Sequence, residues 1–243
     1  ALAMDQGRIV PESMLLDVPV DYSGYIPTNY DDTYNGLVTV RDSLVRSLNA
    51  PAVAVLNQVG VREFLEKLRQ GGLSTIDKGP SHYGLALSLG ACEVRLLDLA
   101  GLYASLMGEG VSIRPRHLPV NETSTRIGNQ VFSPEAAFLT LSMLAGKERT
   151  DMPAAWSLTR DMPEVAWKTG TSFGHRDAWA MGVSGRYTIG VWVGNFDGRP
   201  LKGISGTRHA GPILFDLFRA LSPGDSLPPE RLGLDLDTLK VCR

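Results

Sequence analysis

The chain has 243 residues, of which 43% are apolar and 21% are charged, and its formal net charge is −2. This length suits one large domain or two small ones, and the composition is that of an ordinary folded domain. The small net charge, with both signs interspersed, argues against a nucleic-acid-binding surface. The sequence also lacks an apolar run near the roughly 20 residues that a membrane helix needs.

The first predicted element is a long loop. Residues 17–37 are rich in Asp, Tyr, Pro, Gly and Asn and carry no long apolar period. This composition is typical of an extended loop, and we expect its aromatic side chains to order it.

A helix is predicted directly after this loop. Thr39 can cap it, and Val40, Leu44 and Leu48 recur every four residues, so the helix should run to about Leu48. Proline disfavours helical geometry in the residue before it. We therefore expect the helix to break at Asn49-Ala50-Pro51.

Further helices follow along the middle of the chain. Apolar residues at helical spacing predict helices at 52–59, 61–70 and 92–107. Ser133-Pro134-Glu135 offers a cap, a proline at the first helical position and an acid in the first turn. These signals predict another helix over 135–144.

The sequence period changes in the last third of the chain. Segments 165–172, 178–185 and 187–195 are rich in aromatic and β-branched residues and are separated by glycine-containing turns. Ser184-Gly185-Arg186 suits a hairpin turn between the last two. We expect an antiparallel sheet that a helix at 210–221 covers, which indicates an α+β fold.

The end of the chain differs in composition from the rest. Residues after 221 turn to SPGDSLPPE, so we expect one domain over 1–221 and a linker over 222–243. Cys92 and Cys242 have no cluster of cysteine or histidine nearby, which argues against a metal site. We expect two free thiols and no cofactor.

Two short motifs carry the functional argument. The first is Ser47-Leu48-Asn49, and the second is the mid-strand segment Lys168-Thr169-Gly170-Thr171. In a strand, Lys168 places a cation on one face, and Gly170 lets a ligand backbone lie against the strand. A cation, hydroxyls and an approachable strand suit an extended peptide that ends in a carboxylate.

Taken alone, each motif is a weak signal. A bare Lys-Thr-Gly arises by chance in roughly one chain in twenty of this length. The alternative for Ser47 and Asn49 is ordinary helix-end capping, and the alternative for Lys168 is a solvated lysine on an exposed strand face.

The two motifs in this order resemble the second and third signatures of penicillin-binding proteins and serine β-lactamases. Residues 21–56, DYSGYIPTNYDDTYNGLVTVRDSLVRSLNAPAVAVL, are similar to the segment that leads into Ser-x-Asn in class A penicillin-binding proteins. Residues 165–198 resemble the third-motif region of the same family, most of all its 1C branch. The resemblance covers nearly all of residues 1–221. It implies an antiparallel sheet covered by helices, with an all-helical subdomain.

The sequence departs from the family pattern at the nucleophile. In the family this is the serine of a Ser-x-x-Lys motif upstream of Ser-x-Asn, but no lysine of this chain has a serine three places before it. Residues 1–7, ALAMDQG, resemble the tail of the nucleophile's helix. We therefore expect an N-terminally truncated domain whose nucleophile motif precedes Ala1 and which is inactive alone.

The resemblance implies a peptidoglycan D,D-transpeptidase that cross-links stem peptides through an acyl-serine intermediate and is acylated by β-lactams. Ser47, Asn49 and Lys168 would be catalytic: Ser47 moves protons, Asn49 hydrogen-bonds the substrate amide, and Lys168 attracts the substrate carboxylate. The substrate-binding residues would be Thr169, Gly170, Thr171 and Ser172.

The implied partners are stem peptides ending in D-Ala-D-Ala, β-lactams and other cell-wall synthesis proteins, with no nucleic acid. The implied location is the periplasmic side of the bacterial inner membrane, through an anchor outside this chain. A D,D-carboxypeptidase, an endopeptidase, a β-lactamase and a non-catalytic β-lactam-binding module of the same fold stay open as alternatives. A class A β-lactamase would favour Ser-Asp-Asn, where this chain has Leu48.

Overall fold

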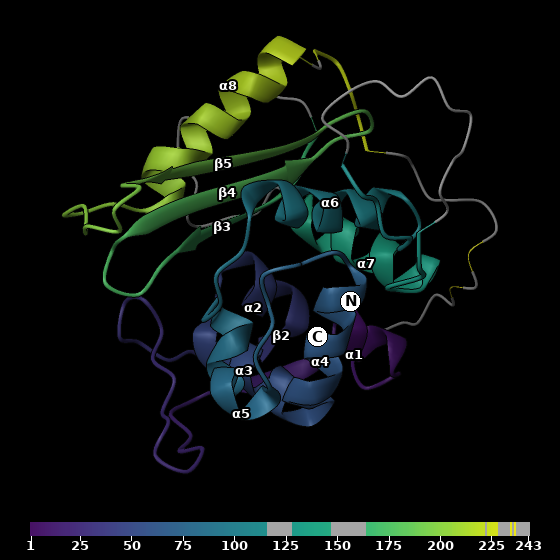
Figure 1. Cartoon of the computed structure of the whole chain (residues 1–243). Helices are drawn as coiled ribbons and strands as arrows, with labels where there is room; N and C mark the ends of the chain where they lie inside the picture. The colour runs from purple at the N-terminus through teal and green to yellow at the C-terminus, as the bar shows by residue number, and fades with distance from the viewer. Residues whose placement is uncertain (116–127, 147–163, 222, 228–233, 235, 237–243) are drawn as a thin grey trace.

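A computed structural model describes residues 1–115, 128–146, 164–221, 223–227, 234 and 236 (Figure 1). Its elements in chain order are α1 (Leu2–Asp5), β1 (Met14–Asp17), β2 (Gly36–Thr39), α2 (Val40–Val45), α3 (Asn49–Val59), α4 (Val61–Gln70), α5 (Pro80–Tyr83), the 3-10 helix η1 (Leu85–Leu89), α6 (Leu96–Met107), α7 (Pro134–Leu144), β3 (Ala166–Thr171), β4 (Asp177–Val183), β5 (Thr188–Gly194), the π-helix η3 (Gly206–Ala210) and α8 (Gly211–Leu221).

The predicted antiparallel sheet is confirmed. Its strand order is β3-β4-β5, and the register pairs Lys168 with Met181 and Trp179 with both Gly170 and Trp192. The predicted hairpin turn is closed by a hydrogen bond from the Ser184 N–H to the Tyr187 carbonyl at 2.8 Å.

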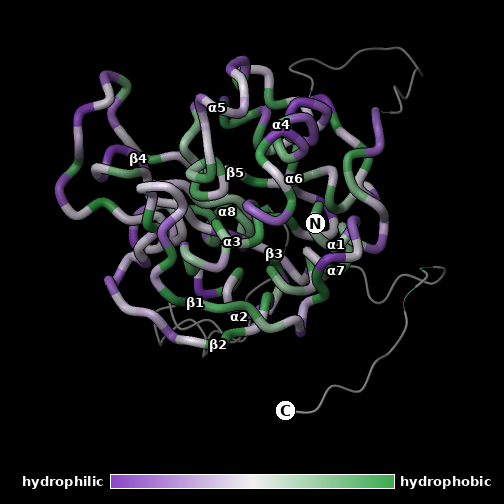
Figure 2. The backbone as a smooth tube through the Cα atoms, turned by 90° about the horizontal axis from the view of Figure 1, so that it is seen from below, coloured by the Kyte–Doolittle hydropathy of each residue, from purple (hydrophilic) through white to green (hydrophobic). Residues whose placement is uncertain are grey.

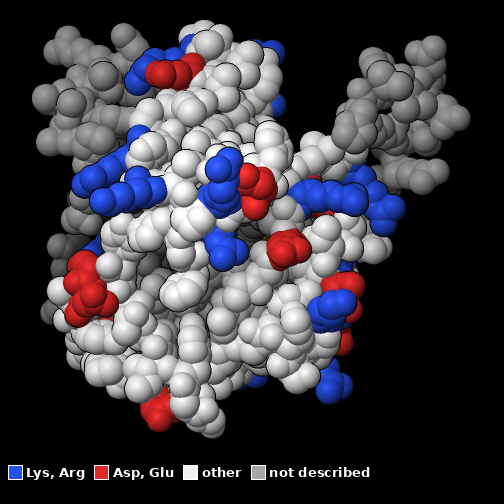
Figure 3. Space-filling view, turned by 60° about the vertical axis from the view of Figure 1, so that its left-hand side comes forward, with Lys and Arg blue, Asp and Glu red and all other residues white. Residues whose placement is uncertain are grey.

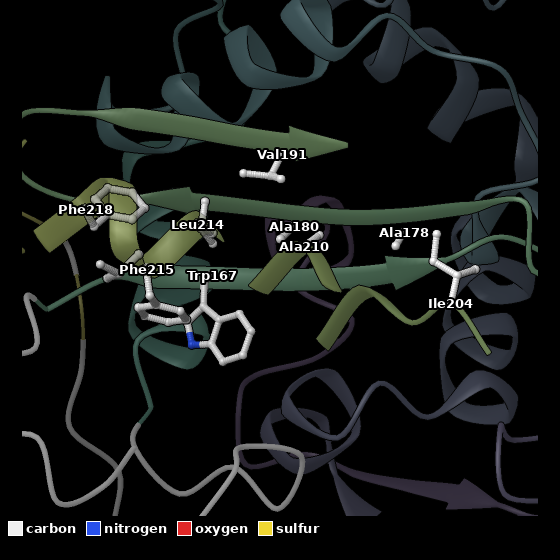
Figure 4. Close-up of a cluster of buried hydrophobic side chains, with 10 residues drawn as sticks. Trp167, Ala178, Ala180, Val191, Ile204, Ala210, Leu214, Phe215 and Phe218 are labelled. Carbon is white, nitrogen blue, oxygen red and sulfur yellow. The ribbon is translucent and has the colours of Figure 1, made fainter. Parts of the chain in front are cut away.

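The sheet lies between two layers of helix. Figure 1 shows α8 across one face and α6 and α7 on the other. On the α8 side, Trp167 of β3 packs edge-on against Phe215, with ring centroids 5.0 Å apart, and Leu214 and Phe218 are fully buried (Figure 4). Burial of each such side chain stabilises the fold by about 1.5–3 kcal/mol. The predicted covering helix therefore fixes the position of β3.

On the opposite face, the sheet joins the helical part of the molecule. Ala166 and Val183 pack with residues of α6 and α7, including Leu106 and Leu141. Beyond them, residues of α3, α4, α5, η1 and α6 form a second core around Leu65 of α4, which is 0% exposed. Figure 2 shows hydrophobic segments in the interior around α3 and α8, and also along β1 and β2 at the edge of the molecule. The expected fold class, with its helical subdomain, is confirmed.

The prediction for residues 39–59 is wrong in one respect. Thr39 caps α2 as expected, because its side chain accepts from the Asp42 N–H at 3.0 Å. However, α2 ends at Val45, and Asn49 is the first residue of α3. Pro51 therefore lies in the first turn of a helix, where its missing N–H would have no helical partner anyway.

The loop prediction for residues 17–37 is also corrected. The ends of this segment belong to β1 and β2, which pair with each other, while 18–35 form the expected loop. Buried polar groups hold this loop, because Asp17 and Asn29 are hydrogen-bonded to each other. Of its aromatic side chains, Tyr34 contributes through its hydroxyl, which donates to the Pro27 carbonyl at 3.1 Å, whereas Tyr30 is 75% exposed.

Two further expectations concern the thiols and the chain end. Cys92 is a free thiol, as expected, while Cys242 and most of the linker predicted at 222–243 lie outside the described residues. Within the part of the chain that the structure describes, every helix is too short or too polar to cross a lipid bilayer.

Candidate active site

The two motifs meet in the structure. The side-chain amine of Lys168, on β3, donates a hydrogen bond to the hydroxyl of Ser47 and a second to the Thr169 carbonyl at 2.9 Å. Ser47 is exposed and Lys168 is half-buried. The predicted cation and the predicted proton-moving hydroxyl therefore lie in direct contact at an accessible place.

Ser47 occupies an unusual backbone conformation. It follows the end of α2 with φ +62°, in the left-handed region that side-chain-bearing residues seldom adopt. The N–H groups of Ser47 and Leu48 return to carbonyls of α2, at 3.2 and 2.9 Å. This tight turn aims Ser47 outward while Leu48 is buried at 8% exposure. An apolar residue at the middle position thus serves as an anchor for the turn.

Asn49 is held at the start of α3. Its main-chain N–H donates to the Asn29 side chain at 2.7 Å, and its side-chain amide donates to the Thr28 carbonyl at 2.6 Å. Asn49 is half-buried. The helix-capping alternative therefore does not describe Asn49, because Asn29 supplies the capping oxygen for it.

Thr169 and Thr171 lie on the other face of β3. The Thr171 hydroxyl accepts from the Gly206 N–H at 3.0 Å, and the Thr169 hydroxyl lies 3.4 Å from that of Thr207. The alternation of a strand places Lys168 and these threonines on opposite sides. The two hydroxyls therefore brace β3 against η3, which follows the sheet in the chain.

Gly206 packs on the sheet backbone beside Gly170. A Cβ added at Gly206 would lie 2.5 Å from the Gly170 carbonyl oxygen and 2.8 Å from that of Trp179. Gly170 itself is exposed. Sequence reasoning missed η3, although a glycine between Ser205 and Thr207 is the residue type that such close backbone approach requires.

Ser172 has a role in the turn that follows β3. Its hydroxyl accepts from the N–H groups of Arg176 at 3.2 Å and Asp177 at 2.8 Å. At the end of the same turn, Asp177 accepts from the Trp192 indole N–H at 2.9 Å. These bonds fix the hairpin, and substrate binding by Ser172 stays a prediction.

The turn between β3 and β4 also contacts the loop after β1. The rings of His175 and Tyr30 meet edge-on at 6.5 Å, and Figure 1 shows both segments on the same side of the molecule. Figure 3 brings that side forward: Lys and Arg lie in a band across its middle, with Asp and Glu among them. Charges of both signs therefore lie on this side of the molecule.

Comparisons with known proteins identify the family of the chain. A family model described as the penicillin-binding protein transpeptidase domain matches residues 1–196. The chain belongs to this transpeptidase family. It is 39% identical over 229 residues to Penicillin-binding protein 1C of Escherichia coli (strain K12). The matched residues make up 94% of this chain and 29% of that protein. It is 31% identical over 205 residues to Penicillin-binding protein 1F of Bacillus subtilis (strain 168), covering 79% of this chain and 28% of that protein.

Solved structures of the family share the fold. Penicillin-Binding Protein 1A from Haemophilus influenzae superposes with a TM-score of 0.72 at 23% identity, over 93% of this chain and 41% of that one. PonA1 from Mycobacterium tuberculosis in complex with penicillin V superposes with a TM-score of 0.77 at 20% identity. This match covers 93% of this chain and 68% of the PonA1 chain. The transpeptidase chain described here spans less than a third of the length of its two curated relatives.

Proposed function

We propose that this chain belongs to a D,D-transpeptidase domain that cross-links peptidoglycan stem peptides through an acyl-serine. The observation that carries the proposal is the hydrogen bond between Lys168 and Ser47. It brings a cation and an exposed hydroxyl together beside Gly170, where the strand has no side chain. Such a site suits an extended peptide with a terminal carboxylate.

The proposed reaction has two acyl-transfer steps. The oxygen of the Ser-x-x-Lys serine bonds to the penultimate D-Ala carbonyl carbon, the amide C–N bond breaks, and the last D-Ala leaves with the serine proton. An amine of a second stem then bonds to the same carbon, the ester C–O bond to the serine breaks, and a proton of the amine returns to the serine oxygen. The serine of this motif is not among the 243 residues.

Each predicted site residue has a place in this reaction. Ser47 relays the proton to the leaving amine, and Lys168 keeps the Ser47 hydroxyl oriented and attracts the substrate carboxylate. Asn49 hydrogen-bonds the substrate amide. The Thr171 N–H is one oxyanion donor, and loss of one such donor typically costs about 3–4 kcal/mol of barrier stabilisation. Thr169 supports this strand from its opposite face, against η3, and Ser172 fixes the turn that follows it.

The proposed setting follows from the substrate. Peptidoglycan stem peptides are cross-linked outside the bacterial inner membrane, so we place the domain on the periplasmic side of that membrane. Its partners are then D-Ala-D-Ala stem ends, β-lactams and other cell-wall synthesis proteins.

A fluorescent penicillin tests the proposal. The natural protein that carries the Ser-x-x-Lys motif should form a covalent adduct that survives denaturation, whereas the 243-residue chain should form none. Replacement of the motif serine by alanine is the matched control and should abolish labelling. An adduct on the 243-residue chain would disprove the assignment of the nucleophile.

Product analysis then identifies the acyl acceptor. With a stem-peptide donor and an added acceptor amine, a transpeptidase releases D-Ala and yields the cross-linked amide. Release of D-Ala with hydrolysed donor alone would indicate a carboxypeptidase. A stable adduct with penicillin and no turnover of the stem peptide would indicate a β-lactam-binding module.

A further inference from the structure

A buried carboxylate is linked by hydrogen bonds to both ends of the Ser47 turn. Asp17, the last residue of β1, is 0% exposed. Its oxygens accept from the Asn29 side-chain amide at 2.8 and 3.0 Å. One of them also accepts from the main-chain N–H and the side-chain amide of Asn35, at 2.9 and 2.6 Å. A buried carboxylate is costly unless its oxygens are hydrogen-bonded, so these contacts fix both asparagines to the end of β1.

Asn29 connects Asp17 to Asn49. Because the amide nitrogen of Asn29 faces the carboxylate, its oxygen is left to accept the Asn49 N–H at 2.7 Å. Leu48 offers no side-chain cap to α3, so Asn29 satisfies one of the N–H groups that a helix start leaves without a partner. The adjacent Thr28 carbonyl accepts from the Asn49 side chain at 2.6 Å. Asn49 is therefore oriented through both its main chain and its side chain.

Asn35 connects Asp17 to the other end of the turn. Its side-chain oxygen accepts from the Arg46 guanidinium at 2.6 Å, and Arg46 directly precedes Ser47. A left-handed backbone such as that of Ser47 persists where the surrounding structure holds it. Here one carboxylate holds the residues on both sides of it.

We propose that Asp17 is a positioning residue for the acyl-transfer site, which sets Ser47 and Asn49 against Lys168 without touching the substrate. This role rests on the proposed function. The contact between Lys168 and Ser47 joins two separate parts of the fold, so a small shift of the turn would break it. A misplacement of about 1 Å can cost on the order of 10²-fold in rate.

The substitution Asp17→Asn tests this role because it keeps the shape of the side chain but replaces one carboxylate oxygen by an NH₂ group. This donor would face the N–H donors of Asn29 and Asn35. In the natural protein with the Ser-x-x-Lys motif, the dissociation constant before acylation and the acylation rate constant are measured separately with fluorescent penicillin. We expect the rate constant to fall about 10- to 100-fold in D17N at a temperature where circular dichroism shows it folded. The matched control is Asp21→Asn in the same loop. Asp21 accepts a hydrogen bond from the Gly24 N–H, and the side-chain oxygen of an asparagine can accept the same bond. It should leave the rate constant unchanged.

A double variant adds a rescue experiment. D17N/N29D moves the carboxylate from residue 17 to residue 29, where it can still accept the Asn49 N–H but loses the bond that the Asn29 amide donates to the Thr33 carbonyl. Partial recovery of the acylation rate constant over D17N supports the positioning role. An unchanged rate constant in folded D17N overturns it. If D17N does not fold, Asn35→Ala at an exposed position is measured instead: a several-fold loss supports the role, and an unchanged rate constant overturns it.

Amide hydrogen exchange, which does not depend on catalysis, tests the positioning role of Asp17 separately from the proposed function. If the unmodified natural protein is not acylated, the proposed function fails. Amide hydrogen exchange at Asn49 in the 243-residue chain then tests the link to Asp17 directly. Faster exchange in D17N than in D21N supports the link, and equal exchange in the two variants overturns it.

Discussion

The side-chain amine of Lys168 donates to the hydroxyl of Ser47, although 121 positions separate the two residues in the chain. The bond joins the edge strand of the sheet to the turn between α2 and α3. Because Ser47 is exposed and Lys168 is half-buried, the bond adds little to stability. Its removal should therefore affect chemistry more than folding.

Lys168→Ala should slow acylation of the natural protein by penicillin about 10²- to 10³-fold, because the cation that orients Ser47 and attracts the carboxylate is lost. The free energy of unfolding should change by less than about 1 kcal/mol. Lys202→Ala, at an exposed position after the sheet, is the control for loss of a positive charge. A K168A protein that is acylated at the normal rate would remove Lys168 from the site.

Ser47→Gly should separate stability from activity. Glycine adopts a φ of +62° without strain, so the free energy of unfolding should rise by about 0.5–1 kcal/mol in urea denaturation. Acylation should fall because the hydroxyl is gone. Ser81→Gly in α5 is the control, and it should lower stability by a similar amount, since glycine is unfavourable in a helix. A decrease in stability for S47G would show that the turn is unstrained.

Gly206→Ala should destabilise the fold by about 1–3 kcal/mol, because the new methyl group would collide with the carbonyl oxygens of Gly170 and Trp179. Thermal or urea unfolding of the 243-residue chain measures the loss. Gly79→Ala, where an added Cβ meets nothing within 4 Å, should stay within about 0.5 kcal/mol of the unmodified chain. Equal stability of the two variants would contradict the close packing of η3 on the sheet.

Cys92 gives a prediction for pH. Burial raises the pKa of its thiol above the ordinary value of 9.0, so the folded chain favours the protonated form. The protonated thiol therefore contributes stability that is fully present below pH 9.0, the pKa of the unfolded chain. This contribution is lost as the pH rises through the higher pKa of the folded chain. In a C242S variant, Cys92 should react with a disulfide reagent at pH 8.0 more slowly than free cysteine does. Equal rates would contradict its burial, and unfolding in urea should remove the difference.

Much of the fold could be predicted from local pattern. The spacing of β3, β4 and β5 and the helix at 61–70 followed from short-range periodicity and turn residues, which tertiary contacts here reinforce. The start of α3 at Asn49 could not be predicted in this way, because it depends on a hydrogen bond to Asn29, a residue 20 positions away. Pro51 predicts a break in the helix, whereas the first turn of a helix accepts proline.

The two motifs of the site were predicted, but their support was not. A sequence shows Asp17, Asn29 and Asn35 as ordinary loop formers, because burial of a carboxylate depends on what folds over it. The residue types alone gave a weak signal: Asp and Asn in a loop usually bond their own neighbours. Only the folded chain shows that these side chains reach Asn49 and Arg46.

The loop after β1 divides into an anchored part and a self-contained part. Asn29 and Asn35 belong to the anchored part, while Tyr22 and Tyr25 bond to each other through their main chains, and Gly24 bonds back to Asp21. Insertions or exchanges over residues 20–26 would therefore leave the hydrogen bonds from Asp17 to Asn29 and Asn35 in place. The surface beside the candidate site can vary in this way while the turn that carries Ser47 keeps its support.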